Sequence, residues 1–226
     1  MSSTQQRGGV RVIIRESPRL RVPFYRQASQ FTCGHASLMM AMKFFQPSMH
    51  LTRGLELDIW RESNLVESYG TSKEGLAIAA ARRGFSVYTM GIFRPHSFVD
   101  EIVDKIPALD KNVLELLYRD TRMKFREMKL RNRNFPIQLP MLRMILKRSQ
   151  VPMLLTSTAL FGDNEALPHW VALTGYSRRV WYVNNPLAKS PNTPVDEARL
   201  TRGVGYQGVQ YAVVVRRLKS AKTQQE

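Results

Sequence analysis

Apolar residues gather in short runs along the chain, and their spacing predicts helices mainly before residue 150 and strands mainly after it. Helical spacing predicts helices at 36–45, 51–60, 71–83, 112–130 and 139–148. Runs rich in β-branched and aromatic residues predict strands at 10–14, 85–90, 151–158, 168–175, 180–184 and 210–217. Together these elements predict an α+β fold.

Capping residues mark two of the predicted helix starts. Thr32 is a good N-cap residue for the helix that begins near Cys33. Thr71 and Glu74 have capping-box spacing, and the helix they open is expected to stop at Gly84.

Cys33 is the only cysteine among 226 residues. At the start of a helix its thiol feels the positive end of the helix dipole. A nearby basic group then lowers the pKa of such a thiol from about 8.5 into the range ~3.5–7.5. Cys33 is therefore a candidate nucleophile, and the alternative interpretation is a small buried hydrophobic residue.

Three polar residues could complete a site around this thiol. Gln27 precedes Cys33 by six residues, and its amide could donate to an oxyanion beside the backbone N–H of Cys33, a role for which Gln30 is a rival. His169 lies at the start of a buried strand, where a general base could reach a helix N-terminus. Asn185 follows the next strand, and its amide could hold the imidazole in one tautomer.

The order Gln, Cys, His, Asn resembles the papain-like cysteine peptidases, most closely the bacteriocin-processing peptidases that remove double-glycine leaders, in a stand-alone form. The matching pieces are Gln27, the run Thr-Cys-Gly-x-Ala-Ser-Leu at 32–38, His-Trp-Val-x-Leu-x-Gly-Tyr at 169–176, and Tyr-Val-Asn-Asn-Pro at 182–186. The resemblance implies a papain-like fold. In it the helical half carries the cysteine on a helix N-terminus and packs on an antiparallel sheet that carries the histidine and the asparagine.

The same resemblance implies a role for each residue. Cys33 would be the nucleophile, His169 the general base and acid, Asn185 the orienting residue and Gln27 the oxyanion donor. Asn185 is preferred to Asn184 because the family usually places its third residue, commonly aspartate, directly before the proline.

This chain departs from the family pattern in three places. His35 stands where proline is usual, Asn185 replaces aspartate, and the separation of Cys33 from His169 is longer than usual. We expect His35 to be a helix-surface residue or to line the substrate groove, and a competition with His169 for the thiolate is the alternative.

The chain is strongly basic, with 34 Lys and Arg against 18 Asp and Glu and a net charge of +16. Half of that excess falls in the segment 119–148, which contains ten basic residues and only two acidic ones, Asp120 and Glu127. The basic residues are Arg119, Arg122, Lys124, Arg126, Lys129, Arg131, Arg133, Arg143, Lys147 and Arg148. This segment is either a docking surface for an acidic partner or nucleic acid, or a solvated helical face.

The helix predicted at 112–130 opens this basic segment. It is expected to be amphipathic, with Val113, Leu116, Leu117 and Met123 on its apolar side and basic residues opposite.

Composition and motifs argue against several other classes of protein. The chain is 43% hydrophobic and 23% charged, as in globular proteins, without an apolar run long enough for a membrane span or a signal peptide. A cytoplasmic protein is therefore expected. The G-x-G-x-x-G match at 203–208 is read as a turn because no helix and second strand can follow it, and the four scattered histidines give no metal site. Neither a cofactor nor a metal is expected.

We therefore predict one papain-like domain over 1–226, with a basic helical insertion at about 93–149 and a disordered tail after about 219. The expected activity is that of a cysteine peptidase acting through a thioester, without membrane insertion. The alternatives are an acyltransferase with the same residues and a non-catalytic polyanion-binding module on the same fold.

Overall fold

The computed structural model describes residues 19–64, 71–92, 98–106 and 108–218. Its helices are α1 (Cys33–Phe45), α2 (Arg53–Ser63), α3 (Lys73–Arg82), α4 (Phe98–Lys105), α5 (Lys111–Glu127), α6 (Leu139–Lys147), the short 3₁₀ helix η1 (Thr158–Phe161) and α7 (Glu197–Gly203). Its strands are β1 (Phe85–Met90), β2 (Arg131–Arg133), β3 (Val151–Ser157), β4 (Pro168–Ser177), β5 (Val180–Asn184), β6 (Thr193–Asp196) and β7 (Ala212–Leu218). The strand predicted at 10–14 and the tail after 219 lie outside the described residues.

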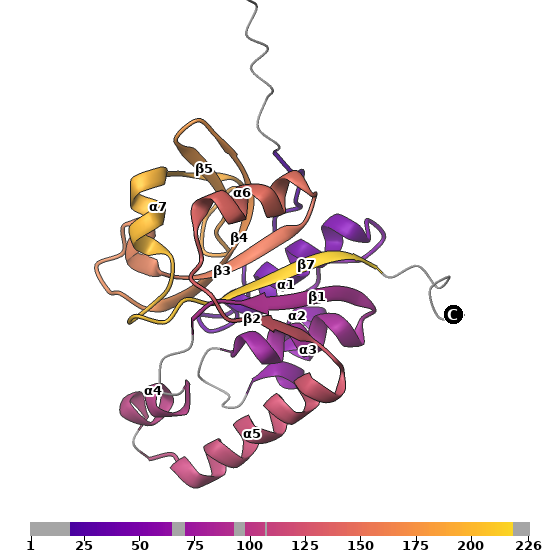
Figure 1. The fold of residues 1–226 in the computed structure, drawn as a ribbon, viewed down its shortest axis with the longest axis vertical. Coiled ribbons are helices and arrows are strands. Elements are labelled where there is room, and N and C mark those ends of the chain that lie inside the picture. Colours follow the sequence, from indigo (N-terminus) through magenta and orange to yellow (C-terminus); the bar gives the residue numbers. More distant parts are fainter. Residues whose placement is uncertain (1–18, 65–70, 93–97, 107, 219–226) are drawn as a thin grey trace, which may run out of the picture.

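The strands form one seven-stranded sheet in the order β2-β1-β7-β3-β4-β5-β6 (Figure 1). The β1–β2 pair is parallel and the other five pairs are antiparallel. The predicted α+β class is confirmed. The short β2, β6 and α7 were not predicted, because three- to seven-residue elements rich in charged residues carry little periodicity.

Alternating residues of the sheet divide the core into two layers. Val213 and Val215 of β7 pack with α1, α2 and α3, whereas Ala212 and Val214 pack with α6 and α7. Figure 1 shows these two groups of helices on opposite sides of the sheet. This is the period of two expected of a strand covered on both faces.

Helix α1 is the central helix of the first layer, and every residue from Cys33 to Met42 is buried. A helix that is apolar on all sides is stable only inside a core, which explains the dense run of leucine, methionine and alanine after Cys33. The start of α1 is thereby fixed against β4.

Helices α4 and α5 form a smaller cluster of their own through Val99, Ile102, Leu114 and Tyr118. Helix α5 continues along α3 and buries Phe125 in the main core. Figure 1 shows α4 and α5 at the periphery of the molecule.

The apolar side predicted for α5 is wrong. Val113, Leu116, Leu117 and Met123 are all exposed, Leu116 at 67% of its surface. The buried side carries Leu114, Tyr118 and Phe125, spaced by four and seven residues. The helix has apolar residues on two sides, and its contacts with α3 and α4 decide which one is buried.

Two cap predictions need correction. The N-cap of α3 is Ser72, whose Oγ accepts from Gly75 N at 3.0 Å, while Thr71 donates to the carbonyl of Ser63 at 2.9 Å. Thr32 does occupy the N-cap position of α1, but its side chain makes no hydrogen bond into the helix. Its hydroxyl instead bonds back to Ser29, whose N–H donates to it at 3.2 Å.

Candidate active site

Cys33 is the first residue of α1 and lies directly against β4. Its Sγ accepts a hydrogen bond from the backbone N–H of Trp170 at 3.5 Å, and the Ser37 hydroxyl donates to the Trp170 carbonyl at 3.1 Å. The two elements meet closely, because a Cβ on Gly34 would lie 2.9 Å from Thr71 Cγ2 and 3.2 Å from Trp170 Cδ1. The thiol is thus held beside the residue that follows His169.

His169 and Asn185 are hydrogen-bonded to each other in the interior. The distance from His169 Nε2 to Asn185 Oδ1 is 2.8 Å, and the same oxygen accepts from Leu187 N at 2.9 Å. Because the Leu187 N–H requires an acceptor, Asn185 presents its oxygen, and His169 therefore carries a hydrogen on Nε2. The neutral imidazole then keeps Nδ1 free to accept a proton.

The structure distinguishes Asn185 from its neighbour Asn184. The Asn184 amide donates to the carbonyls of Val22 and Pro23 at 3.1 and 3.3 Å, and its oxygen accepts from Asn192 N at 2.9 Å. Asn184 therefore holds the extended segment that leads toward Gln27. Asn185 is the asparagine that contacts the histidine.

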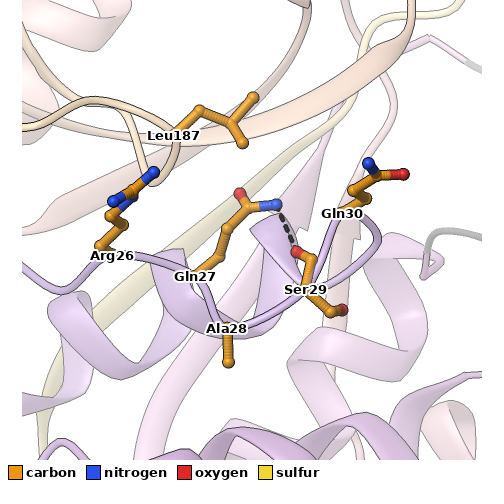
Figure 2. Close-up of a pocket in the computed structure, with 6 residues that line it drawn as sticks. All are labelled: Arg26, Gln27, Ala28, Ser29, Gln30 and Leu187. Carbon is orange, nitrogen blue, oxygen red and sulfur yellow. Dashed lines mark hydrogen bonds between the residues drawn. The ribbon is translucent and has the colours of Figure 1, made fainter.

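Gln27 lies beside the turn that carries Asn185, since its backbone N–H donates to the Pro186 carbonyl at 3.1 Å. Its side-chain amide donates to the carbonyl of Ser29 at 2.6 Å (Figure 2). Its Oε1 is buried and has no hydrogen-bond partner among the described residues. The amide is thus occupied within its own loop, and donation to an oxyanion requires it to turn away from Ser29.

A shallow pocket of about 400 Å³ opens over this loop. Figure 2 shows its walls, formed by residues 26–30 on one side and Leu187 on the other. The rival residue Gln30 is exposed in this pocket wall.

Glu56 of α2 fixes the loop that carries Gln27, a role that no sequence pattern signalled. It is fully buried, accepts two hydrogen bonds from Ala28 N at 3.0 and 3.1 Å, and accepts a third from the Tyr25 hydroxyl at 2.9 Å. Burial and the neighbouring Glu56 carboxylate raise the pKa of Tyr25 to about 12. Glu56 and Tyr25 thus fix the loop that carries Gln27.

Burial governs the protonation of the two central groups. It raises the pKa of the Cys33 thiol, which backbone hydrogen bonds from Trp170 and from the helix start lower only in part. Burial lowers the pKa of His169, and the hydrogen bond that His169 donates to Asn185 opposes that shift. The lowered thiol pKa expected from the helix dipole is therefore wrong for the resting state, in which thiol and imidazole are both neutral near pH 7.

His35 is fully buried, so its predicted place on the helix surface or in the substrate groove is wrong. Its Nε2 lies 3.0 Å from both Ser63 Oγ and Asn64 Oδ1 at the end of α2. Burial lowers its pKa to about 4. His35 ties α1 to α2, and its hydrogen bonds give it no part in activating the thiol.

These elements define an α+β protein of papain-like fold, with a cysteine on a helix N-terminus and a hydrogen-bonded histidine and asparagine on the sheet. The chain belongs to the Peptidase_C39 like family, whose sequence model matches residues 22–202. The resemblance drawn from the motifs is thereby confirmed. The search of curated protein sequences found no match to the chain, so the family assignment rests on the sequence model of the family.

One solved structure supports this fold. It is described as a C39-like peptidase from Bacillus anthracis, and it superposes with a TM-score of 0.52 at 15% identity, covering 90% of this chain and 100% of its own. Two further matches are a double glycine motif protease from an AMS/PCAT transporter in complex with its leader peptide, and the peptidase domain of Streptococcus ComA, a bifunctional ABC transporter of a quorum-sensing pathway. The first has a TM-score of 0.46 at 16% identity, with 88% of this chain and 97% of that chain covered. The second has a TM-score of 0.47 at 12% identity, with coverage of 87% and 98%.

Within the described ranges, none of the helices is long and apolar enough to cross a bilayer.

Proposed function

We propose that the protein is a cysteine peptidase that cleaves a peptide or amide bond through Cys33, His169 and Asn185. The observation that carries the proposal is the arrangement around the thiol. Cys33 Sγ bonds to the backbone next to a histidine whose Nε2 is held by Asn185 at 2.8 Å, with Nδ1 left as the acceptor. Membership of a peptidase-like family supports the same activity.

The reaction would begin with transfer of the thiol proton of Cys33 to His169 Nδ1 as the sulfur attacks the substrate carbonyl carbon. The negative charge then moves to the carbonyl oxygen, where the backbone N–H of Cys33 and the Gln27 amide would donate to it. Collapse of this intermediate breaks the carbon–nitrogen bond, and His169 returns the proton to the leaving amine. Water then attacks the thioester carbon while His169 takes its proton. Collapse of the second tetrahedral intermediate breaks the carbon–sulfur bond, releases the acid and returns the proton to Cys33 Sγ.

Burial of both reacting groups supports this order of events. A neutral thiol and a neutral imidazole avoid the cost of two charges in the interior until a substrate is present. Asn185 would stabilise the imidazolium that forms, because the amide oxygen remains bonded to Nε2–H in both protonation states.

The substrate would be an extended peptide laid over the loop at 26–30 and the turn at 185–187. The pocket between Gln27 and Leu187 lies directly on that path, and its apolar Leu187 wall is 40% exposed. Binding there would also draw the Gln27 amide away from Ser29 and toward the reacting carbonyl.

The test is a comparison of the protein with its Cys33→Ala variant on a mixed peptide library, with new termini identified by mass spectrometry. We expect the natural protein to generate termini that the variant does not. Equal products from both would overturn the proposal. An added primary amine that appears covalently joined to the new carboxyl ends would instead identify acyl transfer with the same residues.

We also propose that the basic segment 119–148 docks an acidic partner or nucleic acid. The exposed Arg122 and Arg126 of α5 form no ion pair within the described part of the chain, while Arg119 and Lys124 pair only within the helix, with Glu115 and Asp120. Association with heparin or RNA that weakens steeply as salt rises is expected. Binding that salt does not change would contradict this docking surface.

A further inference from the structure

A second hollow lies at the β1–β2 edge of the sheet, several strands away from the His169 strand in the order given above. Its volume is about 750 Å³, within the range of pockets that bind small molecules, about 300–1,000 Å³. Strand β2 pairs with β1 only over Tyr88–Met90, so among the described residues the first half of β1 has an open edge, which forms one wall. Figure 1 shows the short β2 beside β1, reached directly from the end of α5.

The walls of this hollow are strongly basic. Lys129, Arg131, Arg133 and Arg216 all line it, and no acidic residue of the described part of the chain does. None of these four cations forms an ion pair within the described ranges of the chain. Gathered around one space, they repel one another, and an anion between them would remove that repulsion.

Two of the three guanidinium groups converge on a single aromatic ring. Arg133 lies 4.5 Å and Arg216 lies 5.4 Å from the ring centre of Tyr88, which is itself buried. The two groups come from separate segments, β2 and β7. The convergence is therefore a product of the fold and not of local sequence.

Arg216 offers an unsatisfied donor at this place. One terminal nitrogen donates to Ser86 Oγ at 2.8 Å, but its Nε is buried without a hydrogen-bond partner among the described residues. A buried donor without an acceptor is costly, and such groups in native proteins often mark the place of a ligand or an ion. Ser86 and Arg216 also line an adjoining hollow with Arg148 and Arg217, which extends the positive charge along the edge.

Part of the lining is apolar, with Phe85, Val87, Met128 and Leu130. A ligand complementary to both parts carries several negative charges at one end and a flat or apolar group at the other. Planar guanidinium groups favour phosphate oxygens, which they bind through two parallel hydrogen bonds.

We propose that this hollow binds an organic phosphate with two or more negative charges, of the size of a nucleotide. Its phosphates lie among Arg131, Arg133, Arg216 and Lys129, and its organic part lies against Met128 and Leu130. The inference rests on the proposed docking role of the segment 119–148, to which three of the four cations belong. It is independent of the proposed peptidase activity.

The test is isothermal titration of the full-length protein with ATP at low salt. Two matched double variants each lose two positive charges: Arg131→Gln with Arg133→Gln inside the hollow, and Arg119→Gln with Arg126→Gln on α5 outside it. All four side chains are exposed, so both variants are expected to fold. We expect saturable binding at one site, weakened at least about tenfold by the first pair and less than about twofold by the second.

Competition experiments distinguish binding of the phosphates from binding of the organic part of the ligand. Pyrophosphate is expected to displace ATP and adenosine is not. Equal loss in both double variants would overturn the pocket while leaving the general basic docking surface intact. No binding of ATP at about 1 mM, or tighter binding of an acidic peptide or an oligonucleotide at the same arginines, would also overturn it.

Discussion

At the scale of single residues, the neighbouring Asn184 and Asn185 have different hydrogen-bond partners. Asn185 bonds to His169, whereas Asn184 bonds to the backbone of residues 22 and 23. The sequence favoured Asn185 only through its place before the proline. The geometry gives a physical reason, since only its oxygen meets the imidazole.

Replacing Asn185 should therefore change both the rate and its pH dependence. The hydrogen bond that His169 donates to Asn185 raises the pKa of His169, so Asn185→Ala should lower that pKa further. We expect kcat/KM on a cleaved peptide to fall on the order of 10- to 100-fold, part of the ~10²–10⁴ that a general base contributes. The acidic limb of the pH profile, set by protonation of His169, should move to lower pH.

Two companion variants sharpen that measurement. Asn185→Asp places a negative charge beside the ring and should move the acidic limb to higher pH with activity retained. Asn184→Ala should lower stability with little movement of the limb. An Asn185→Ala profile with an unmoved acidic limb would count against the assigned contact.

His35 gives a prediction about stability. Its pKa is lowered to about 4 in the folded protein, against 6.5 for the free side chain, so the unfolded chain takes up the proton first as pH falls. The stabilisation is complete above pH 6.5 and is lost as pH falls toward 4. This residue alone should lower the free energy of unfolding by about 2 kcal/mol between pH 7 and pH 4.5.

Urea unfolding at the two pH values measures this effect. In His35→Gln the drop between pH 7 and pH 4.5 should be smaller by that amount, because no proton is taken up at position 35. His50→Gln, at an exposed position, is the control and should behave as the natural protein does. An identical drop in all three proteins would contradict the buried, neutral state of His35.

At the scale of elements, the loop carrying Gln27 depends on a carboxylate from another helix. Glu56 satisfies the Ala28 N–H and the Tyr25 hydroxyl, so Glu56→Ala leaves both without their partner. We expect a loss of about 3 kcal/mol in unfolding free energy, the scale of hydrogen bonds to a buried charge, together with a lower kcat/KM. Tyr25→Phe removes one bond and should cost about 1 kcal/mol.

Asp58→Ala on the same helix is the matched control. Its ion pair with Arg61 is exposed and should contribute less than about 1 kcal/mol. If Glu56→Ala were no more destabilising than Asp58→Ala, Glu56 would not be what anchors the loop.

Two variants of α5 test which of its two apolar sides packs against the rest of the protein. Leu114→Ala should cost about 2–5 kcal/mol in unfolding free energy, because Leu114 is buried with Val99 and Ile102. Leu116→Ala should change it by less than about 0.5 kcal/mol, because the side chain is exposed. Thermal unfolding of the two variants decides between the sides, and the reverse order would restore the side expected from sequence.

The sequence predicted the main elements well where their signal is local. Helix α6 and strands β1, β3, β4 and β5 lie within a few residues of their predicted limits, because apolar runs mark them. The buried side of α5, the burial of His35 and the role of Glu56 could not be predicted. Each depends on a neighbour more than 20 residues away in the chain, such as Ser63 for His35 and Ala28 for Glu56.

At the scale of the whole molecule, the candidate site exists only because the two halves of the fold meet. Cys33 comes from the helical layer, while His169 and Asn185 come from the sheet. The motifs made these residues the candidates, but they did not predict their protonation, which depends on how completely the layers close over them. The single-domain organisation over 1–226 with an insertion at about 93–149 stays a prediction.

The measurement that tests the central claim most directly is the alkylation rate of Cys33 by iodoacetamide as a function of pH, in the natural protein and in His169→Ala. If His169 takes the proton from the thiol, the natural protein should react at pH 7 at least about tenfold faster than the variant, whose rate should rise only as the thiol ionises at alkaline pH. Equal rates at every pH in the two proteins, or a thiol that does not react in either, would contradict a cysteine nucleophile activated by His169.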